Sequence, residues 1–587
     1  MNFFWEKIKV FQKDILAFFI IAAGILLMYG RSAGYGGDIW DDSFYLALFP
    51  ADSSLSHLFT QLQKPVLGLY SPLVTLSFYL DRLLFYSGDP VFSAHIWNLF
   101  YFTLGTWGLY RLFRELSFPG REGQRWELGV RFAAAGALLW AFHPQRVESV
   151  VWIAERKDVL LACCAWWAWA LFIRGFRKGV FSYGAFVLFL LSFGIKPMLI
   201  LFPGVLALWI FFETGSKNLR DYRFLLPWCA VSCVFFVQGL FSVSGSGGAG
   251  PGRFEVLLWN CGNYAVTAFL PIGTGPFHPF YPEPGWGNFY ILLSSLALYF
   301  LCFLLLPQYR KTVLLPLLWA MVGAAFLLAP ASGVVRIGNA DWADRYNLLP
   351  SAMAALVLCA VTSRVWQSPG KLFKAGGIAC FGGLFLWNAA ACSMQIPVWK
   401  SGATVMKEAL SQSVPNYRVL FLAAVEALEQ GKEKEFYQLT ERLPREEELT
   451  PFDAGTVRIF RMATDAQWSF RKKQSAEGVK KVELLLADPA WRRITAISDG
   501  FPQQLLSQAA EYYLNCNRQD LAAVVFERVG LCYPGDMEEY FYRGLALIFQ
   551  KKYAEAVIEL EKAAELAPRD TAVRYQLEFA RRHAGTK

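Results

Sequence analysis

The stretch from Gly36 to Asp42 holds three carboxylates, Asp38, Asp41 and Asp42, directly after the first very apolar segment of the chain. It therefore lies at a membrane edge, where carboxylates are costly unless they are solvated, paired or bound to something cationic. Clustered carboxylates are candidates for a general base, and we expect that role for Asp41 or Asp42, with Asp38 in support. The alternative is a solvated loop that happens to be acidic.

A second cluster, between positions 143 and 158, is dense in side chains that can hold anions or move protons. His143 and Glu148 could act in proton transfer or metal binding. Its cations could hold a phosphate, Arg through a bidentate fork. The alternative is that Arg and Lys extend along the membrane interface and pair with the neighbouring carboxylates.

Two further ionisable sites adjoin apolar runs. Lys196 precedes Pro197 between two such runs, and Asp344-Arg345 precedes another. We expect five cations to contact a phosphate: Arg146, Arg156, Lys157, Lys196 and Arg345. We expect four residues to support the site: Asp38, His143, Glu148 and Asp344.

The composition is that of a membrane protein with room for a soluble domain. Of 587 residues, 55% are hydrophobic and 17% aromatic, and the mean hydropathy is +0.32. Apolar runs of about 18 residues or more are typical of membrane helices. We predict about eleven, at 11–30, 92–113, 131–142, 157–174, 180–195, 197–213, 222–240, 288–306, 312–330, 346–365 and 373–393.

Basic residues fall in alternate loops between these runs, as in the loops at 7–13, 111–131 and 174–178. Under the positive-inside rule these loops are cytoplasmic, so the N-terminus is inside and the chain after about residue 394 is outside. The carboxylate and mixed-charge clusters then share the outer face. Such one-sided clustering favours a functional site over random solvated loops. The net charge of +9 does not indicate nucleic-acid binding, because the basic residues lie in short loops.

Two outer loops are long, at 31–90 and 241–287. In the first, the run from Tyr70 to Tyr86 is predicted to form an amphipathic helix on the outer surface. The second begins with a Gly/Ser-rich stretch at 241–254, which is predicted to be mobile. That stretch is either a lid over a bound substrate or a plain connector.

From about residue 400 the composition becomes charged and helical. The blocks 503–536 and 537–570 carry small residues and a closing Pro in phase; Ala510 and Gly544, for example, both stand at position 8. This spacing indicates tetratricopeptide repeats, in which small residues let two antiparallel helices cross closely. Because about three repeats are needed for stability, we expect divergent repeats at 414–445 and 454–488. Their concave surface would hold a peptide or a partner protein.

The eleven cysteines have no CxxC or other metal-ligand spacing, and most lie inside apolar runs, where Cys behaves as a small hydrophobe. Cys516 and Cys532 lie in the soluble part and could pair there in an oxidising space.

Neighbouring carboxylates and several cations in one outer cavity suit a lipid-linked sugar phosphate. The cations would hold the phosphate as it leaves, and a carboxylate would act as general base on an acceptor hydroxyl. The sequence contains no Gly-rich phosphate loop, which favours a lipid-linked donor over a nucleotide sugar.

Seven stretches occur in a specific order: Trp40-Asp41-Asp42, Tyr70-Ser71-Pro72-Leu73, His95-Ile96-Trp97-Asn98, His143 to Asp158, Lys196-Pro197-Met198, Tyr281-Pro282-Glu283-Pro284 and Gly338 to Pro350. Together with the late repeats they resemble the transmembrane and tetratricopeptide-repeat O-mannosyltransferases and their bacterial relatives, within the glycosyltransferase C superfamily. The resemblance covers nearly the whole chain.

This resemblance implies inverting transfer from a polyprenyl-phosphate sugar to a protein hydroxyl, with the catalytic Asp in the first outer loop, which is Asp41 or Asp42 here. Relatives often read Asp-Arg-Tyr-Thr-Tyr-Leu-Pro where this chain has the segment from Asp344 to Pro350, so the donor sugar stays open. Some superfamily members need a divalent metal and others do not, so a metal stays open too, and no other cofactor is implied.

We therefore predict an all-α protein with a polytopic membrane domain at 1–398 and an extracytoplasmic repeat domain at 399–587. Its expected partners are a polyprenyl-phosphate sugar, an acceptor protein or peptide and membrane lipid, but no nucleic acid. A bacterial inner membrane with periplasmic repeats is the expected location. The alternative is a membrane-anchored repeat scaffold for envelope polysaccharide or appendage assembly. A lipid-linked-oligosaccharide polymerase or ligase is a near neighbour within the enzyme class.

Overall fold

The computed structural model describes residues 2–50, 53–67, 69–84, 88–119, 125–215, 218–243, 253–278, 285–306, 313–332, 342–412, 415–449, 451–496, 500–568 and 570–585. The chain is 80% helical, which confirms the all-α class. Within the described part, the strands are a short antiparallel hairpin of β1 (Ser117–Pro119) and β2 (Arg125–Glu127).

The chain divides into two compact units, Met1–Val414 and Pro415–Lys587. The sequence-based boundary at 398/399 falls earlier, because the short helix that follows it belongs to the first unit. That helix, α17 (Gly402–Ser411), starts with a capping box in which Ser401 and Thr404 hydrogen-bond to each other's backbone.

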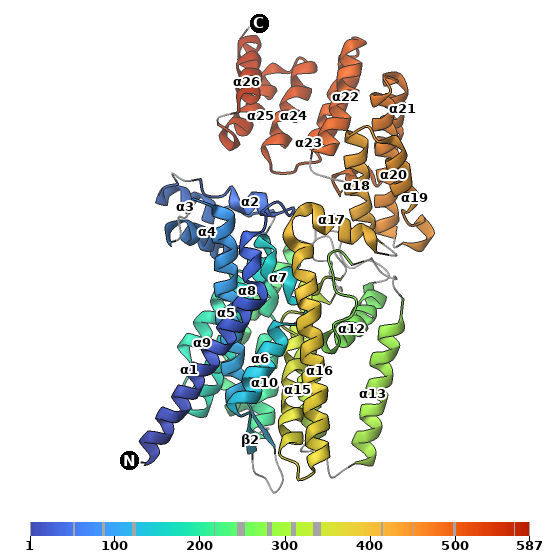
Figure 1. Ribbon diagram of the computed structural model, residues 1–587. Coiled ribbons are helices and arrows are strands. Elements are labelled where there is room, and N and C mark those ends of the chain that lie inside the picture. The colour runs from blue at the N-terminus through green and yellow to red at the C-terminus, as the bar shows by residue number, and fades with distance from the viewer. Residues whose placement is uncertain are drawn as a thin grey trace. The chain divides into compact units, whose positions relative to one another are not determined.

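Long helices run side by side in the first unit (Figure 1). Each segment for which the sequence predicts a membrane helix contains a helix. These are α1 (Asn2–Tyr29), α5 (Pro90–Glu115), α6 (Val130–Ala141), α8 (Arg156–Arg177), α9 (Tyr183–Phe193), α10 (Phe202–Thr214), α11 (Leu226–Val243), α13 (Gly287–Leu305), α14 (Leu315–Leu328), α15 (Ser351–Trp366) and α16 (Lys371–Gln395).

Five of the described helical segments are long and apolar enough to cross a membrane: Phe11–Gly34, Ile153–Arg177, Leu219–Gly239, Gly287–Leu305 and Lys371–Lys400. Five others are apolar but shorter, so the count of about eleven spans is not confirmed. The 11 residues of α9 extend only about 17 Å, against about 30 Å of hydrocarbon. The 26-residue α5 is long enough, but polar side chains such as Asn98 and Thr106 lower its hydropathy. These helices are compatible with an integral membrane protein.

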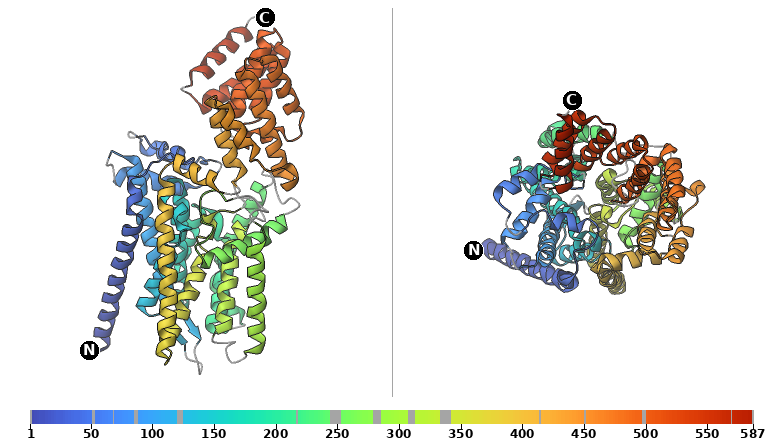
Figure 2. Two further views of the ribbon diagram at one scale, coloured as in Figure 1. Left: turned by 45° about the vertical axis from the view of Figure 1, so that its right-hand side comes forward. Right: turned by 90° about the horizontal axis from the view of Figure 1, so that it is seen from above.

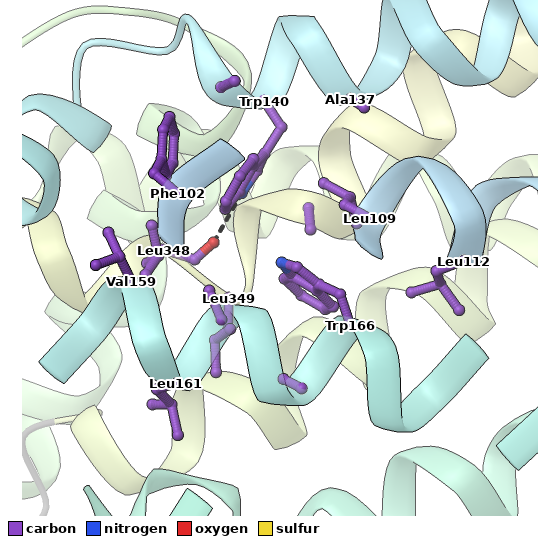
Figure 3. Packing of buried hydrophobic residues seen from close by; sticks show 14 of the residues in the cluster. Phe102, Leu109, Leu112, Ala137, Trp140, Val159, Leu161, Trp166, Leu348 and Leu349 are labelled. Carbon is purple, nitrogen blue, oxygen red and sulfur yellow. Dashed lines mark hydrogen bonds between the residues drawn. The ribbon is translucent and has the colours of Figure 1, made fainter. Parts of the chain in front are cut away.

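The core of the first unit packs two tryptophans between α5, α6 and α8 (Figure 3). Trp140 and Trp166 are both buried and meet edge to face. The Trp140 indole N–H donates to the Leu348 carbonyl over 2.9 Å. This bond ties α6 to the turn that precedes α15, and so fixes the position of the charged residues just before that turn.

Short elements gather at one end of these long helices, opposite the N-terminus (Figure 2). They are α2 (Asp42–Leu46), α3 (Leu55–Leu62), α4 (Pro72–Leu84), α7 (Arg146–Val151), η3 (Ile153–Glu155), η4 (Pro197–Leu199), η9 (Asp344–Asn347) and η10 (Ile396–Lys400). The helix expected from Tyr70 onward is present as α4. The loop expected at 241–287 instead contains a 17-residue helix, α12 (Arg253–Phe269), while 244–252 lie outside the described residues.

The second unit consists of antiparallel helix pairs. They are α18 (Tyr417–Glu429) with α19 (Glu433–Glu441), α20 (Pro451–Arg471) with α21 (Ser475–Ala487), α22 (Phe501–Asn515) with α23 (Gln519–Gly530), and α24 (Met537–Phe549) with α25 (Tyr553–Leu566), followed by α26 (Thr571–Ala584). Small residues lie where helices cross: a Cβ on Gly544 would stand 2.6 Å from the Leu560 side chain.

Cys516 and Cys532 lie at opposite ends of α23, just before it begins and just after it ends. A 12-residue helix is about 18 Å long, whereas the Cα atoms of a disulfide are less than about 7 Å apart. Both cysteines are free, so the disulfide considered from the sequence does not form within the chain.

Candidate functional site

Asp42 is a buried carboxylate at the first position of α2. Its side chain has no exposed surface, and Oδ1 accepts the backbone N–H of Ala154 over 2.8 Å. Its Oδ2 has no hydrogen-bond partner among the described residues. The donor lies in η3, and the first N–H groups of a helical turn have no partner inside it, so they suit a carboxylate.

Burial raises the pKa of Asp42 from its ordinary value of 3.8 to about 7. The hydrogen bonds from the backbone oppose this rise, and the neighbouring Asp41 and Asp38 add to it. A carboxylate with a pKa near the working pH is matched to general-base catalysis. Asp41 is half-buried at the N-cap of α2, and Asp38 is exposed.

The loop that carries these carboxylates is held against η3. The Trp152 indole N–H donates to the Ile39 carbonyl over 3.2 Å, and the Trp40 ring meets Trp152 edge to face. Trp40 has a φ of +33°, a backbone region that is uncommon for residues other than glycine. The left-handed turn at Trp40 directs the chain into α2, so it sets where Asp42 begins the helix.

Four consecutive ionisable residues, Glu155 to Asp158, splay in different directions as η3 passes into α8. Successive residues on a helix are about 100° apart, so neighbours cannot share one partner. The Lys157 ammonium lies 3.2 Å from the Glu155 carboxylate and 5.8 Å from the centre of the Tyr45 ring. Asp158 accepts a hydrogen bond from Lys196 over 2.7 Å.

Arg345 in η9 completes this cluster from a distant part of the sequence. Its backbone N–H donates to Glu148 over 2.9 Å, and its guanidinium forms an ion pair with the same carboxylate. It also lies 3.5 Å from Glu155. Burial raises the pKa of Glu148, and the charge of Arg345 opposes that rise. We call Glu148, Glu155, Lys157, Asp158, Lys196 and Arg345 the ionic cluster.

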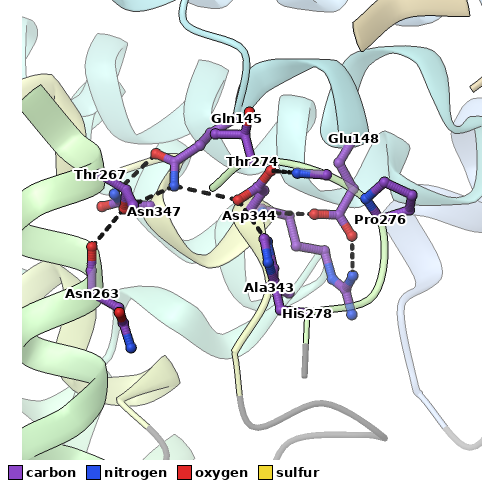
Figure 4. Close-up of polar contacts among 12 residues, drawn as sticks. Gln145, Glu148, Asn263, Thr267, Thr274, Pro276, His278, Ala343, Asp344 and Asn347 are labelled. Carbon is purple, nitrogen blue, oxygen red and sulfur yellow. Dashed lines mark hydrogen bonds and ion pairs between the residues drawn. The ribbon is translucent and has the colours of Figure 1, made fainter. Parts of the chain in front are cut away.

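Asp344, the neighbour of Arg345, points to a different segment (Figure 4). Its carboxylate accepts the Gly275 backbone N–H over 2.9 Å and lies 2.9 Å from Nε2 of His278. His278 stacks on Trp342 with ring centres 3.8 Å apart. Asp344 therefore holds residues 271–278, which we call the strap, whereas Arg345 holds the ionic cluster.

Two of the five cations expected to bind phosphate lie outside the ionic cluster, with no exposed surface. Arg156 is 2.5 Å from Asp81 and donates to the Asn98 side chain over 2.7 Å. Arg146 donates to the Asn347 carbonyl over 3.3 Å. Both guanidinium groups are engaged by protein partners. Lys157, Lys196 and Arg345 are the cations that the structure brings together.

The remaining candidates are His143, a possible metal site and two of the matched stretches. His143 is buried and lines a small pocket with Trp140, Ser351 and Asn388, at a different place from Asp42. In the described part of the chain, no group of three or more His, Cys, Asp or Glu residues is arranged to hold a metal ion. The matched stretches at 281–284 and 338–341 lie outside the described residues.

Sequence reasoning missed several groups that shape this site. The backbone N–H of Ala154 has no signal in the sequence, because any residue supplies one. His278 is a lone histidine in a loop, and its pairing with Asp344 spans 66 positions. Asp81 had a weak signal, as a carboxylate on an otherwise apolar helix.

No protein-family model, no curated protein and no solved structure matches this chain.

Proposed function

We propose that this protein is an integral-membrane glycosyltransferase that moves a sugar from a polyprenyl-phosphate donor to a protein hydroxyl on the extracytoplasmic face. One observation carries the proposal. A buried carboxylate with a pKa of about 7, Asp42, is bound through Ala154 to the turn η3, which bears Glu155 of the ionic cluster and leads directly to Lys157 at the start of α8.

The ionic cluster is suited to anion binding because its cations are more exposed than its carboxylates. The side chains of Arg345, Lys157 and Lys196 are 18%, 11% and 9% exposed, whereas those of Glu148, Glu155 and Asp158 are 6%, 3% and 4% exposed. The carboxylates thus support the cations from the buried side, and a phosphate would approach from the exposed side.

The reaction that fits is a direct displacement. The Asp42 carboxylate removes the proton of the acceptor hydroxyl while the oxygen of that hydroxyl bonds to the anomeric carbon of the sugar. The bond from that carbon to the phosphate oxygen breaks, its electron pair goes to the phosphate, and the cations stabilise the charge. Because Asp42 has no exposed surface, the acceptor must shift neighbouring groups to reach it.

The finer architecture belongs to the same proposal. The shorter apolar helices would complete a bundle of about eleven spans, with α9 and α10 crossing as partial spans around the break at Lys196. The helix pairs of the second unit would form a tetratricopeptide-type solenoid that recruits or presents the acceptor.

The test is transfer of radiolabelled sugar from polyprenyl-phosphate donors to protein, with the purified full chain in detergent. We expect Asp42→Asn to abolish transfer, Asp41→Asn to reduce it, and the exposed-residue variant Asp38→Asn to retain most of it. Near-normal transfer by both Asp41→Asn and Asp42→Asn would exclude the proposed base. An absence of turnover with every donor would favour the second candidate.

That second candidate is a membrane-anchored scaffold for envelope polysaccharide or appendage assembly. The observation that favours it is that the second unit is compact in itself and built of helix pairs. Expression of residues 400–587 alone in a deletion strain separates the two. Restored function would favour the scaffold, and a strict requirement for Asp42 would favour the enzyme.

A further inference from the structure

Residues 395–412, which we call the connector, contact both sides of the candidate site. The connector comprises Gln395, η10 and α17 up to Gln412, and the sequence-based division placed its residues from 399 on in the repeat domain. We propose that it is a positioning element that holds the acidic loop 36–42 and the strap in one arrangement. The catalytic consequence of this inference rests on the proposed function, whereas the positioning itself does not.

The first half of the connector holds the acidic loop. The Gly36 backbone N–H donates to the Lys400 carbonyl over 3.0 Å. Gly402 then passes so close that a Cβ there would stand 2.9 Å from the Asp38 carbonyl oxygen. That atom belongs to the backbone, so it cannot move aside as the end of a flexible side chain can. A side chain at position 402 would therefore displace the loop that leads into Asp42.

The stacking of Trp399 on Trp152 anchors this half. Their ring centres are 5.8 Å apart, and Trp399 is buried. Trp152 is also the residue whose indole N–H holds the Ile39 carbonyl. The connector thus contacts the acidic loop directly through the Lys400 carbonyl and indirectly through Trp152. A movement of η10 would therefore displace the loop through both contacts.

Both ends of the connector hold the strap. The Gln395 side chain donates to the Thr274 carbonyl over 3.1 Å, and the Gln412 side chain donates to the Pro276 carbonyl over 3.1 Å. Between these two carbonyls, the Gly275 N–H is bound by Asp344. One backbone group in each of three consecutive strap residues is therefore held by a side chain from outside the strap.

The two held segments meet at a strained contact. The rings of Trp40 and Phe277 are 4.3 Å apart, edge to face, and Phe277 has a φ of +55°. Left-handed conformations at bulky residues persist only where the surroundings impose them. The connector supplies such a constraint on both segments, which explains how this contact beside Asp41 and Asp42 is maintained.

Hydrogen exchange of the full chain in detergent tests the inference without any assumption about activity. In Gly402→Ala, we expect the amides of residues 36–46 to exchange about tenfold faster, because the loop is displaced. Gly34→Ala is the matched control, since nothing lies within 4 Å of a Cβ built there, and it should leave exchange unchanged. Unchanged exchange at 36–46 in a folded Gly402→Ala variant would overturn the inference.

A second variant keeps the test usable if Gly402→Ala does not fold. The double substitution Gln395→Ala with Gln412→Ala removes only the two side-chain donors to the strap, and exchange at 271–278 should rise. Ser411→Ala is its control, because the Ser411 hydroxyl bonds within its own helix to Glu408. Unchanged exchange at 271–278 in the double variant would count against the positioning role.

Transfer kinetics give the catalytic readout. We expect Gly402→Ala to lower kcat by roughly a hundredfold while the KM for the donor stays within about threefold, as for a displaced reacting group. A rise in KM with unchanged kcat would contradict a role in positioning Asp42. If the wild type transfers no sugar, the proposed function fails, while the exchange experiment still decides whether the connector positions these segments.

Discussion

The backbone N–H of Ala154 donates to Oδ1 of Asp42 over 2.8 Å, across 112 positions of sequence. This bond fixes the position of Oδ1. Oδ2 has no hydrogen-bond partner among the described residues and is therefore the candidate proton acceptor. The bond also ties Asp42 to the turn that contributes Glu155 to the ionic cluster, because Ala154 immediately precedes Glu155. Several expected outcomes depend on this relationship.

Asp42→Asn should stabilise the protein at alkaline pH. The pKa of Asp42 is raised from 3.8 to about 7, so between these values the folded state holds a proton that the unfolded state has lost. Stability therefore falls as the pH rises through this window, by a penalty on the order of 4 kcal/mol that is complete above pH 7. Asn is neutral throughout and escapes the penalty.

Thermal unfolding in detergent at pH 5 and pH 8 measures this effect. The melting temperature of Asp42→Asn relative to wild type should be higher at pH 8 than at pH 5. The exposed Asp38→Asn variant should show no such trend. An equal difference at both pH values would mean that the Asp42 carboxyl is not buried as a neutral group.

The transfer rate should itself depend on the ionisation of Asp42. Only the ionised carboxylate can accept a proton, so kcat/KM should fall about tenfold per pH unit below the pKa of about 7. A pH profile with polyprenyl-phosphate donor below its KM checks this. A half-maximal rate below pH 5 would indicate a different base, with Asp41 the first alternative.

Removal of one charge pair in the ionic cluster should weaken donor binding without unfolding the protein. Lys196→Met alone leaves Asp158 buried and unpaired, which should lower stability by about 3–5 kcal/mol. The double variant Lys196→Met with Asp158→Asn removes both charges and should restore the melting temperature. We expect its donor KM to rise about tenfold, the loss of one charged hydrogen bond. An unchanged KM would remove Lys196 from the donor site.

Asp81→Ala should destabilise the first unit strongly. Burial raises the pKa of Asp81 to about 6 even though Arg156 opposes the rise, and the Arg156 guanidinium has no exposed surface. Loss of the carboxylate leaves a buried cation with a missing partner, at a cost of about 3–5 kcal/mol. The free energy of unfolding, with Asp38→Ala as the exposed control, tests this. A loss of unfolding free energy smaller than that of the control would show that the hydrogen bonds from Arg156 to Asn98 and to the Ala94 carbonyl compensate for the missing carboxylate.

Gly544→Ala should destabilise the second unit, because its Cβ would stand 2.6 Å from Leu560. Overpacking of this kind costs about 1–3 kcal/mol. Gly585→Ala is the control, since nothing lies within 4 Å of a Cβ there. Urea unfolding followed by far-ultraviolet circular dichroism should show a lower midpoint for Gly544→Ala alone.

The helices of this chain could be located from the sequence because apolar run length is a local property. Whether a helix crosses a membrane is a less local property. Each of α9 and α10 lies in one predicted stretch, but α9 ends at Phe193 and α10 begins only at Phe202, so the residues around Lys196 belong to neither helix. The helix α12 was missed because its mixed composition, with Asn260 and Asn263 buried against other segments, lacks a continuous apolar run.

The site shows the same division. Asp41 and Asp42 could be selected from their types and position. The pairings of the ionic cluster could not, because Arg345 reaches Glu148 across 197 positions and Lys196 reaches Asp158 across 38. Arg146 and Arg156 have the residue type that binds phosphate, and both are buried against protein acceptors that the sequence does not indicate. Residue type indicates which chemistry is available, and only packing decides which group faces the ligand.

The charged residues at the start of α8 constrain how this helix packs against its neighbours. Arg156 pairs with Asp81 and Asp158 pairs with Lys196, both on other segments, so a shift of one residue in the register of α8 would turn each of these charges by about 100°. Both of these pairs would then be lost together, whereas the pair of Lys157 with Glu155 would move with the helix. The two pairs therefore favour one register of α8 against the segments that carry Asp81 and Lys196.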